Sequence, residues 1–84
     1  CITDKTKAIV VTHQFGYPVD TNEIIEFCKN TQILIIEDCA QAHGSTIKNK
    51  HVGTFGDIGT YSFFPGKNLG CFGDGGAIIT NNKK

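Results

Sequence analysis

Four consecutive apolar residues, Ile33 to Ile36 (ILII), constrain the fold of this chain more than any other feature of its sequence. A strand that is apolar at every position is covered on both faces, which is typical of a parallel sheet in an α/β protein. A β-branched run, Ala8 to Thr12 (AIVVT), precedes it and also indicates a buried strand. The pattern therefore predicts an α/β fold built on a mostly parallel sheet.

The segment between these two strands has the pattern of a helix. Asp20 can cap its first turn, Glu23 follows as in a capping box, and Lys29 stands in the last turn, where a cation suits the helix dipole. The apolar residues expected to face the sheet are Ile24, Ile25, Phe27 and Cys28. Strand, helix and strand in this order form a βαβ unit, whose crossover should be right-handed.

The second half of the chain predicts two more strands, Ile58 to Phe64 and Ala77 to Thr80. Ser45 to Val52 is expected to form a small hairpin or loop that turns at Lys48 to Lys50. Pro65 to Gly76 is a long glycine-rich loop.

The chain of 84 residues is at most one domain, near the lower end of what a single core can stabilise. It contains no methionine, and its last apolar run has nothing beyond to cover it, so we expect a piece from the interior of a larger domain. Eight basic and eight acidic residues cancel, which gives no electrostatic reason to expect nucleic acid or an anionic membrane as a partner. No apolar run is long enough to span a bilayer.

The cysteines match no zinc-binding pattern, and there is no C-x-x-C. They are Cys1, Cys28, Cys39 and Cys71. Cys39 and His43 have helical spacing, but two local ligands fall short of the four that a structural zinc needs. Cysteines in apolar segments behave as small hydrophobes, so a reduced, cytoplasmic setting is the default expectation.

Lys67 differs from the other lysines, which flank turns, termini or a helix end. It follows Phe63 and Phe64 and lies between Gly66 and Gly70, at the edge of apolar surface. Desolvation there favours the neutral amine, which is the form that attacks a carbonyl to make a Schiff base. A surface lysine in a turn is the plainer alternative.

Two further groups join Lys67 in a pattern of three chemistries. Asp38 places a carboxylate after one buried strand, where α/β sheets bind ligands. Ser62 places a hydroxyl in the next strong strand, five residues before Lys67. Pyridoxal phosphate needs an amine for its aldehyde carbon, an anion facing its ring nitrogen and donors for its phosphate.

Two kinds of nucleotide-binding site are alternatives, and the sequence fits both of them less well. Gly66-Lys67 is similar to the end of a P-loop, but that motif needs a glycine where Tyr61 stands and a hydroxyl residue where Asn68 stands. A Rossmann site with Asp38 as the ribose ligand lacks the G-x-G-x-x-G turn between the first strand and the helix.

At this point the sequence resembles the DegT/DnrJ/StrS family of sugar-nucleotide aminotransferases. The resemblance rests on IIEDCAQAHGS (Ile35 to Ser45), FGDIGTYSFFPGKNLG (Phe55 to Gly70) and GDGGAIITN (Gly73 to Asn81), and it extends upstream through VTHQFGYPVD (Val11 to Asp20). It implies a fragment of the large domain of a fold-type I, aspartate-aminotransferase-like transferase. Residues 1–84 would be part of the domain that binds pyridoxal phosphate, without the upstream phosphate-binding part and the C-terminal small domain.

The resemblance also implies a role for four residues. Lys67 would form the Schiff base with the cofactor and then move a proton between the substrate and cofactor carbons. Asp38 would pair with the pyridinium nitrogen, and Gln41 would lie against the ring near its phenolic oxygen. Ser62 would hydrogen-bond the phosphate.

Each of these residues also has a plainer structural explanation. Asp38 could cap the turn after its strand, Gln41 could be a surface residue, and the Ser62 hydroxyl could be satisfied by the backbone. His43 is either close behind the site or a satisfied polar residue on its loop, and His13 ends a strand without an assigned role. Two aspartates beside glycines are expected to fix turns: Asp57 and Asp74.

The expected reaction is ping-pong transamination from an amino acid, by resemblance glutamate, to a keto-sugar nucleotide. The family is generally homodimeric, and the isolated fragment is expected to be inactive. Related proteins dehydrate sugars, and in some of them a histidine replaces the lysine, so Lys67 favours transamination. The other alternative is a non-catalytic binding or regulatory module with the same fold.

Overall fold

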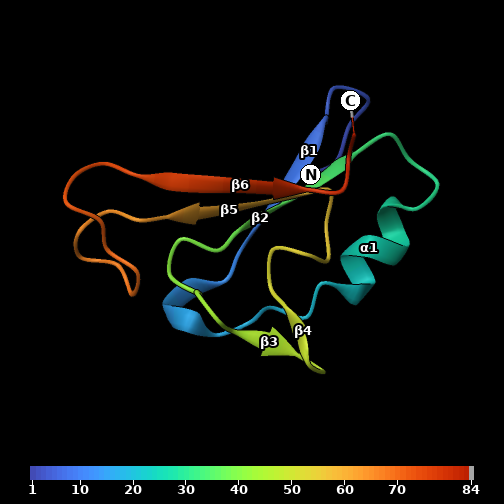
Figure 1. The fold of residues 1–84 in the computed structure, drawn as a ribbon. Coiled ribbons are helices and arrows are strands. Elements are labelled where there is room, and N and C mark those ends of the chain that lie inside the picture. Colours follow the sequence, from blue (N-terminus) through green and yellow to red (C-terminus); the bar gives the residue numbers. More distant parts are fainter. Residues whose placement is uncertain (84) are drawn as a thin grey trace.

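The computed structural model describes residues 1–83 (Figure 1). In chain order its elements are β1 (Ala8–Thr12), the 3-10 helix η1 (Gln14–Gly16), α1 (Asn22–Cys28), β2 (Leu34–Asp38), β3 (Thr46–Ile47), β4 (Lys50–His51), β5 (Ile58–Ser62) and β6 (Gly76–Thr80). The predicted helix, strands and hairpin are all present, with bounds shifted by one or two residues. No helix among residues 1–83 is long and apolar enough to cross a membrane.

The main sheet has the strand order β1-β2-β5-β6. β1 with β2 and β2 with β5 are parallel pairs, whereas β6 runs antiparallel to β5. The expected mostly parallel sheet and its β1-α1-β2 unit are therefore confirmed. Because β1, β2 and β5 run in one direction, their carboxyl ends meet at a single edge of the sheet.

One face of the sheet is covered, by α1 and by the segment that carries the β3–β4 hairpin (Figure 1). Under α1, the buried side chains are Val11, Cys28 and Ile35, with Ile9, Ile24, Ile25 and Ile33 packed around them. Under the hairpin, the buried cluster is Cys39, Ala42 and Val52, against which Tyr61 packs. These two clusters fix α1 and the loop after β2 relative to the sheet edge.

One expectation for the helix is wrong. Phe27 is 56% exposed and is not among the residues packed in the core under α1, so it does not face the sheet as expected. The N-cap is Thr21, and its side chain makes no capping hydrogen bond. Asp20, one residue earlier, accepts a hydrogen bond from the backbone N–H of Asn22, the first residue of α1, at 3.0 Å, as expected of a residue that caps the first turn.

The opposite face of the sheet is open within residues 1–83. Val10, Leu34 and Ile78 on that face are 62%, 47% and 73% exposed. Strand register places Asp38 beside Thr60 on the same face, at the carboxyl edge. The open face is thus apolar along its length and polar where the parallel strands end.

Candidate active site

Three of the four predicted site residues line one cavity at the carboxyl edge of the sheet. They are Asp38, Gln41 and Lys67, and the wall is completed by Thr12, Gln14 and Ala40. Asp38 ends β2, Gln41 lies in the turn that follows, and Lys67 comes from the loop after β5. The sheet therefore brings together groups that are up to 29 positions apart in the sequence.

One carboxylate oxygen of Asp38 accepts a hydrogen bond, and the other has no partner among residues 1–83. Its Oδ1 accepts a hydrogen bond from the backbone N–H of Ala40 at 3.0 Å, so the side chain does stabilise the turn after the strand. Its Oδ2 has no hydrogen-bond partner within residues 1–83. The half-buried carboxylate is thus oriented by the turn and still presents an oxygen to the cavity.

Gln41 is oriented by the loop after β1. Its Oε1 accepts a hydrogen bond from the backbone N–H of Phe15 at 3.0 Å. Because a backbone N–H must meet the amide oxygen, the amide NH₂ points elsewhere and is left as a donor. The side chain is exposed, as the surface alternative required, but it borders the same cavity as Lys67.

Lys67 is placed by the folding of its loop back on β5. Its backbone N–H donates to the Phe64 carbonyl at 2.8 Å, and the Cys71 N–H donates to the Phe63 carbonyl at 2.8 Å. Gly70 permits this closure, because a Cβ there would lie 2.3 Å from the Pro65 carbonyl oxygen. The Lys67 side chain is half-buried, and its ammonium has no ion-pair partner among the residues described.

Ser62 lies apart from the other three. It lines neither of the two cavities that contain Lys67. Its Oγ accepts a hydrogen bond from the backbone N–H of Phe64 at 3.3 Å, which is the backbone satisfaction that its plainer explanation required. The hydroxyl hydrogen remains a donor, on the same sheet face as Asp38 by register.

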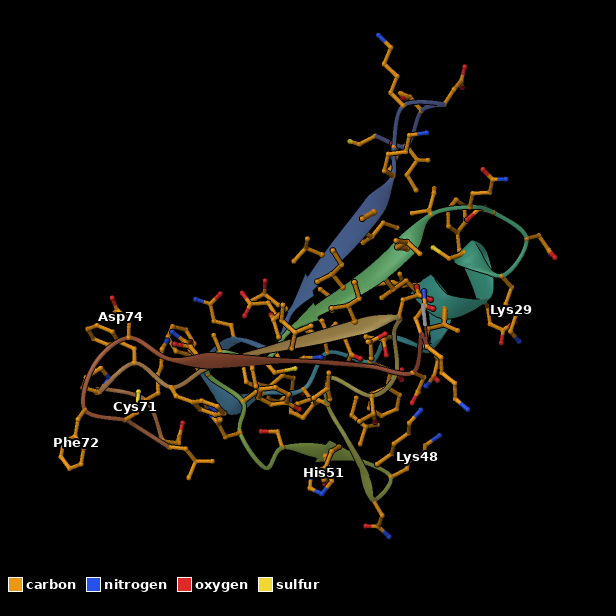
Figure 2. All side chains as sticks on the ribbon, turned by 45° about the horizontal axis from the view of Figure 1, so that its top comes forward. Lys29, Lys48, His51, Cys71, Phe72 and Asp74 are labelled. Carbon is orange, nitrogen blue, oxygen red and sulfur yellow. The ribbon has the colours of Figure 1, made fainter. Side chains whose placement is uncertain are left out.

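Asp57 and Asp74, the two aspartates expected to fix turns, differ in the hydrogen bonds that their side chains make. Asp57 accepts a hydrogen bond from the Ile35 backbone N–H at 2.8 Å, so its side chain ties its loop to β2, 22 positions away, rather than fixing a local turn. Asp74 makes no side-chain hydrogen bond within residues 1–83. Figure 2 shows Asp74 with Cys71 and Phe72 at the far end of the loop between β5 and β6.

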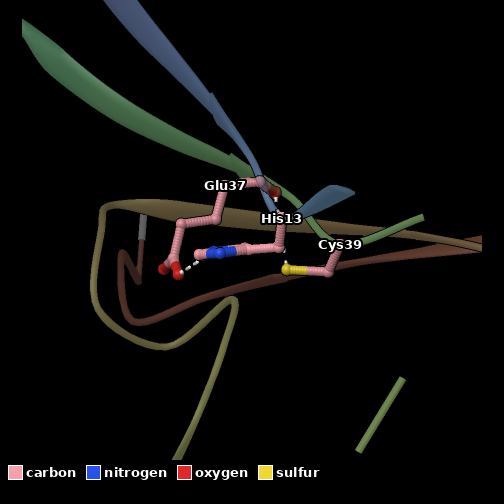
Figure 3. A group of neighbouring side chains, drawn as sticks. All are labelled: His13, Glu37 and Cys39. Carbon is pink, nitrogen blue, oxygen red and sulfur yellow. Dashed lines mark hydrogen bonds and ion pairs between the residues drawn. The ribbon is translucent and has the colours of Figure 1, made fainter. Parts of the chain in front are cut away.

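Glu37, which sequence reasoning left without a role, is the best-connected side chain near the site. It is fully buried, on the sheet face opposite Asp38. Its Oε2 accepts the backbone N–H groups of Phe55 and Gly56, both at 2.7 Å. Its Oε1 accepts the Gly53 N–H at 2.8 Å and Nε2–H of His13 at 3.0 Å (Figure 3).

The partners of His13 fix its tautomer. Its Nδ1 accepts the backbone N–H of Val19 at 3.0 Å, so the ring proton sits on Nε2, which faces Glu37. His13 and Glu37 therefore tie three segments together: the loop after β1, the end of β2 and the loop before β5. One signal was present in the sequence: a carboxylate at an inward position of a buried strand requires partners.

His13, Glu37 and Cys39 have ligand atoms within 4.8 Å of one another, but their chemistry does not suit a metal. Both ring nitrogens of His13 and both oxygens of Glu37 already make hydrogen bonds. Burial, with Glu37 nearby, raises the pKa of the Cys39 thiol to about 11, which keeps it protonated rather than a thiolate ligand. The group is better explained as a structural anchor.

A second cavity adjoins the first, because Gln41 and Lys67 line both. Its other walls are Phe15, Gly16, His43, Ser45, Gly66 and Asn68. The His43 ring packs near the rings of Tyr61 and Phe63, at centroid distances of 5.6 and 5.9 Å. Its two nitrogens are buried without a hydrogen-bond partner in residues 1–83, so of the two alternatives given for His43, that of a satisfied polar residue is wrong.

Comparison with known proteins agrees with this geometry. GDP-perosamine synthase of Escherichia coli O157:H7 is 51% identical over 82 residues, which cover 98% of this chain and 22% of that protein. The crystal structure of an aminotransferase from Psychrobacter cryohalolentis superposes with a TM-score of 0.90 at 44% identity, over 96% of this chain and 20% of that one. These matches confirm the expected fold class.

The E. coli GDP-4-keto-6-deoxy-D-mannose-3-dehydratase, solved with bound hydrated pyridoxal phosphate, superposes with a TM-score of 0.84 at 36% identity, over 96% of this chain and 21% of that one. The chain thus spans about a fifth of the length of the proteins it matches. The model of the DegT/DnrJ/EryC1/StrS aminotransferase family matches residues 1–84. The chain therefore belongs to that family, as the sequence motifs indicated.

Proposed function

We propose that these residues are part of the cofactor-binding large domain of a pyridoxal-phosphate-dependent aminotransferase. It would transfer an amino group from an amino acid, glutamate, to a keto-sugar nucleotide. The observation that carries the proposal is the convergence of Asp38, Gln41 and Lys67 on one cavity, in a chain of an aminotransferase family. A cytoplasmic homodimer is part of the same proposal.

The four predicted site residues carry the chemical groups that pyridoxal phosphate needs. Lys67 offers an amine without an ion-pair partner in residues 1–83, for the aldehyde carbon. Asp38 offers a carboxylate oxygen for a protonated ring nitrogen, and Gln41 offers an amide NH₂ for the phenolic oxygen. Ser62 offers a hydroxyl hydrogen for the phosphate. When bound, the cofactor supplies an electrophilic carbon and a ring that accepts electrons as a substrate C–H bond breaks.

The chain's own residues would then hold and move protons. The Lys67 amine would hold the cofactor and, when free, would carry a proton at Nζ between the two reacting carbons. The Asp38 carboxylate keeps the ring nitrogen protonated, and the turn that fixes its Oδ1 orients it for this task. Gln41 would donate a hydrogen bond from its amide NH₂ to the phenolic oxygen of the cofactor.

The test uses the full-length protein with pyridoxal phosphate, L-glutamate and a keto-sugar nucleotide as acceptor. Three acceptors are tried: GDP-4-keto-6-deoxy-D-mannose and its dTDP- and UDP-linked counterparts. Lys67→Ala is expected to abolish amine transfer, whereas Lys29→Ala, on the surface of the helix end, should leave it unchanged. Asp38→Asn should keep the fold and lose rate by about 100-fold or more, because an amide cannot hold the pyridinium proton. Turnover by Lys67→Ala would refute the mechanism.

Sugar dehydration is the second candidate, because a dehydratase superposes on this chain at 36% identity. Lys67 favours transamination, since it supplies the amine that carries the proton between carbons. Mass analysis of the sugar product separates the two reactions: transamination replaces a carbonyl oxygen with an amine, and dehydration removes a hydroxyl. Cofactor binding with neither product would instead support the non-catalytic module.

A further inference from the structure

The loop after β1 presents an aromatic ring that the fold of residues 1–83 does not use. The Phe15 side chain is 85% exposed. Its backbone lies in the left-handed region, with φ 55° and ψ 25°. A bulky residue adopts that conformation rarely, and such outliers persist only where surrounding contacts impose them. Neither burial nor an easy backbone conformation accounts for phenylalanine at this position.

Two hydrogen bonds with side chains hold the loop at Phe15 and Gly16 in this conformation. The Phe15 N–H donates to Gln41 Oε1 at 3.0 Å, and the Ser45 hydroxyl donates to the Gly16 carbonyl at 2.8 Å. Gly16 continues the left-handed turn at φ 77°. Two side chains from the segment after β2 therefore hold the loop, and both of them line the second cavity.

The second cavity leads from Phe15 to the reacting amine. Phe15, Gln41 and Lys67 all line it, and its volume of about 520 Å³ lies in the range of small-molecule sites. Its polar rim includes Asn68, an exposed amide without a hydrogen-bond partner in the described part of the chain. An aromatic face beside the uncommitted amide of Asn68 suits a sugar, whose C–H faces pack on rings and whose hydroxyls need partners.

We propose that Phe15 is a specificity-determining residue, whose ring packs against the sugar of the acceptor substrate in the cavity that it shares with Lys67. The inference rests on the proposed function and adds a residue to it. The amino-acid donor has no sugar ring, so it gains nothing from this contact. Phe15 should therefore affect only one of the two half-reactions.

The experiment measures each half-reaction separately in the full-length protein loaded with pyridoxal phosphate, from the change in cofactor absorbance. L-glutamate is the donor, and the acceptor is whichever of the three sugar nucleotides named above the wild type uses best. Phe15→Ala should lower kcat/KM for the acceptor by about tenfold or more and leave kcat/KM for glutamate within about twofold. Phe15→Tyr keeps the ring and should behave like the wild type.

Tyr17→Ala is the matched control. Tyr17 is 79% exposed on the same loop but lines neither cavity with Lys67, so both half-reactions should be unchanged. Unchanged acceptor kinetics in Phe15→Ala, or an equal loss in both half-reactions, would overturn the inference and leave the proposed function standing. A wild type that uses none of the three acceptors would refute the proposed acceptor class, and the inference with it.

Discussion

Glu37→Gln tests whether one buried carboxylate organises the loops around the site. Glutamine has the same shape but replaces one acceptor oxygen with a donor. Each oxygen of Glu37 accepts two N–H groups: Phe55 and Gly56 on Oε2, Gly53 and His13 on Oε1. Whichever way the amide is turned, two donors then face an NH₂ group.

The magnitude follows from those two donors. A buried donor left without an acceptor costs about 1–3 kcal/mol, so the substitution should cost about 2–6 kcal/mol of unfolding free energy. A change of tautomer in His13 does not rescue it, because the Val19 N–H already occupies Nδ1. A loss of this size is a large fraction of the stability of an ordinary domain, which is about 5–15 kcal/mol.

The assay compares thermal midpoints and amide hydrogen exchange in the full-length protein. The N–H groups of Gly53, Phe55 and Gly56 should lose protection in Glu37→Gln. Glu26→Gln is the matched control, since Glu26 pairs with Lys29 at 2.5 Å on the exposed surface and should change stability by less than about 0.5 kcal/mol. A change in Glu37→Gln as small as in the control, with protection of residues 53–56 intact, would refute the anchor.

Two further predictions concern packing and pH. Gly59→Ala should destabilise by about 1–3 kcal/mol, because its Cβ would lie 2.3 Å from the Gly53 carbonyl oxygen, whereas Gly73→Ala meets nothing within 4 Å and should be neutral in the same melting experiment. Burial raises the pKa of the Cys39 thiol from 9.0 to about 11. As the pH rises, the thiol therefore loses its proton at a lower pH in the unfolded chain than in the folded one. Unfolding free energy should therefore fall between pH 9.0 and about 11, and the fall should be shallower in Cys39→Ala; an equal slope in both proteins would contradict the shift.

Sequence patterns were sufficient for the elements of the fold. Ile33 to Ile36 and Ala8 to Thr12 indicated neighbouring parallel strands, because apolar and β-branched runs of that length are rarely anything else. Lys48 and Asn49 take left-handed conformations in the turn of the β3–β4 hairpin, where a turn was predicted. These features depend on residues close together in the sequence, which is why they could be predicted from it.

Contacts between residues far apart in the sequence could not be predicted from it. The partners of Glu37 come from residues up to 24 positions away, and no local pattern indicates which N–H groups a buried carboxylate will meet. The exposure of Phe27 was missed because a helix with four apolar residues does not show which of them faces the sheet. An apolar run also shows that a strand needs cover, but not which part of the chain provides it.

The candidate site was predicted in part for the same reason. Asp38 is the last residue of its strand, so the edge of the sheet determines its position, and Lys67 stands out by the residues around it. Phe15 did not stand out, because its left-handed backbone and its contact with Gln41 exist only once β1 and β2 lie side by side.

The proposed anchoring role of Lys67 is tested most directly by trapping the cofactor. The full-length protein is saturated with pyridoxal phosphate, reduced with borohydride, digested and analysed by peptide mass. A pyridoxyl group on Lys67, absent from the other lysines, is the predicted result. A folded, cofactor-saturated protein without an adduct on Lys67 would contradict the proposal, and the chain would then share the fold of its family without this chemistry.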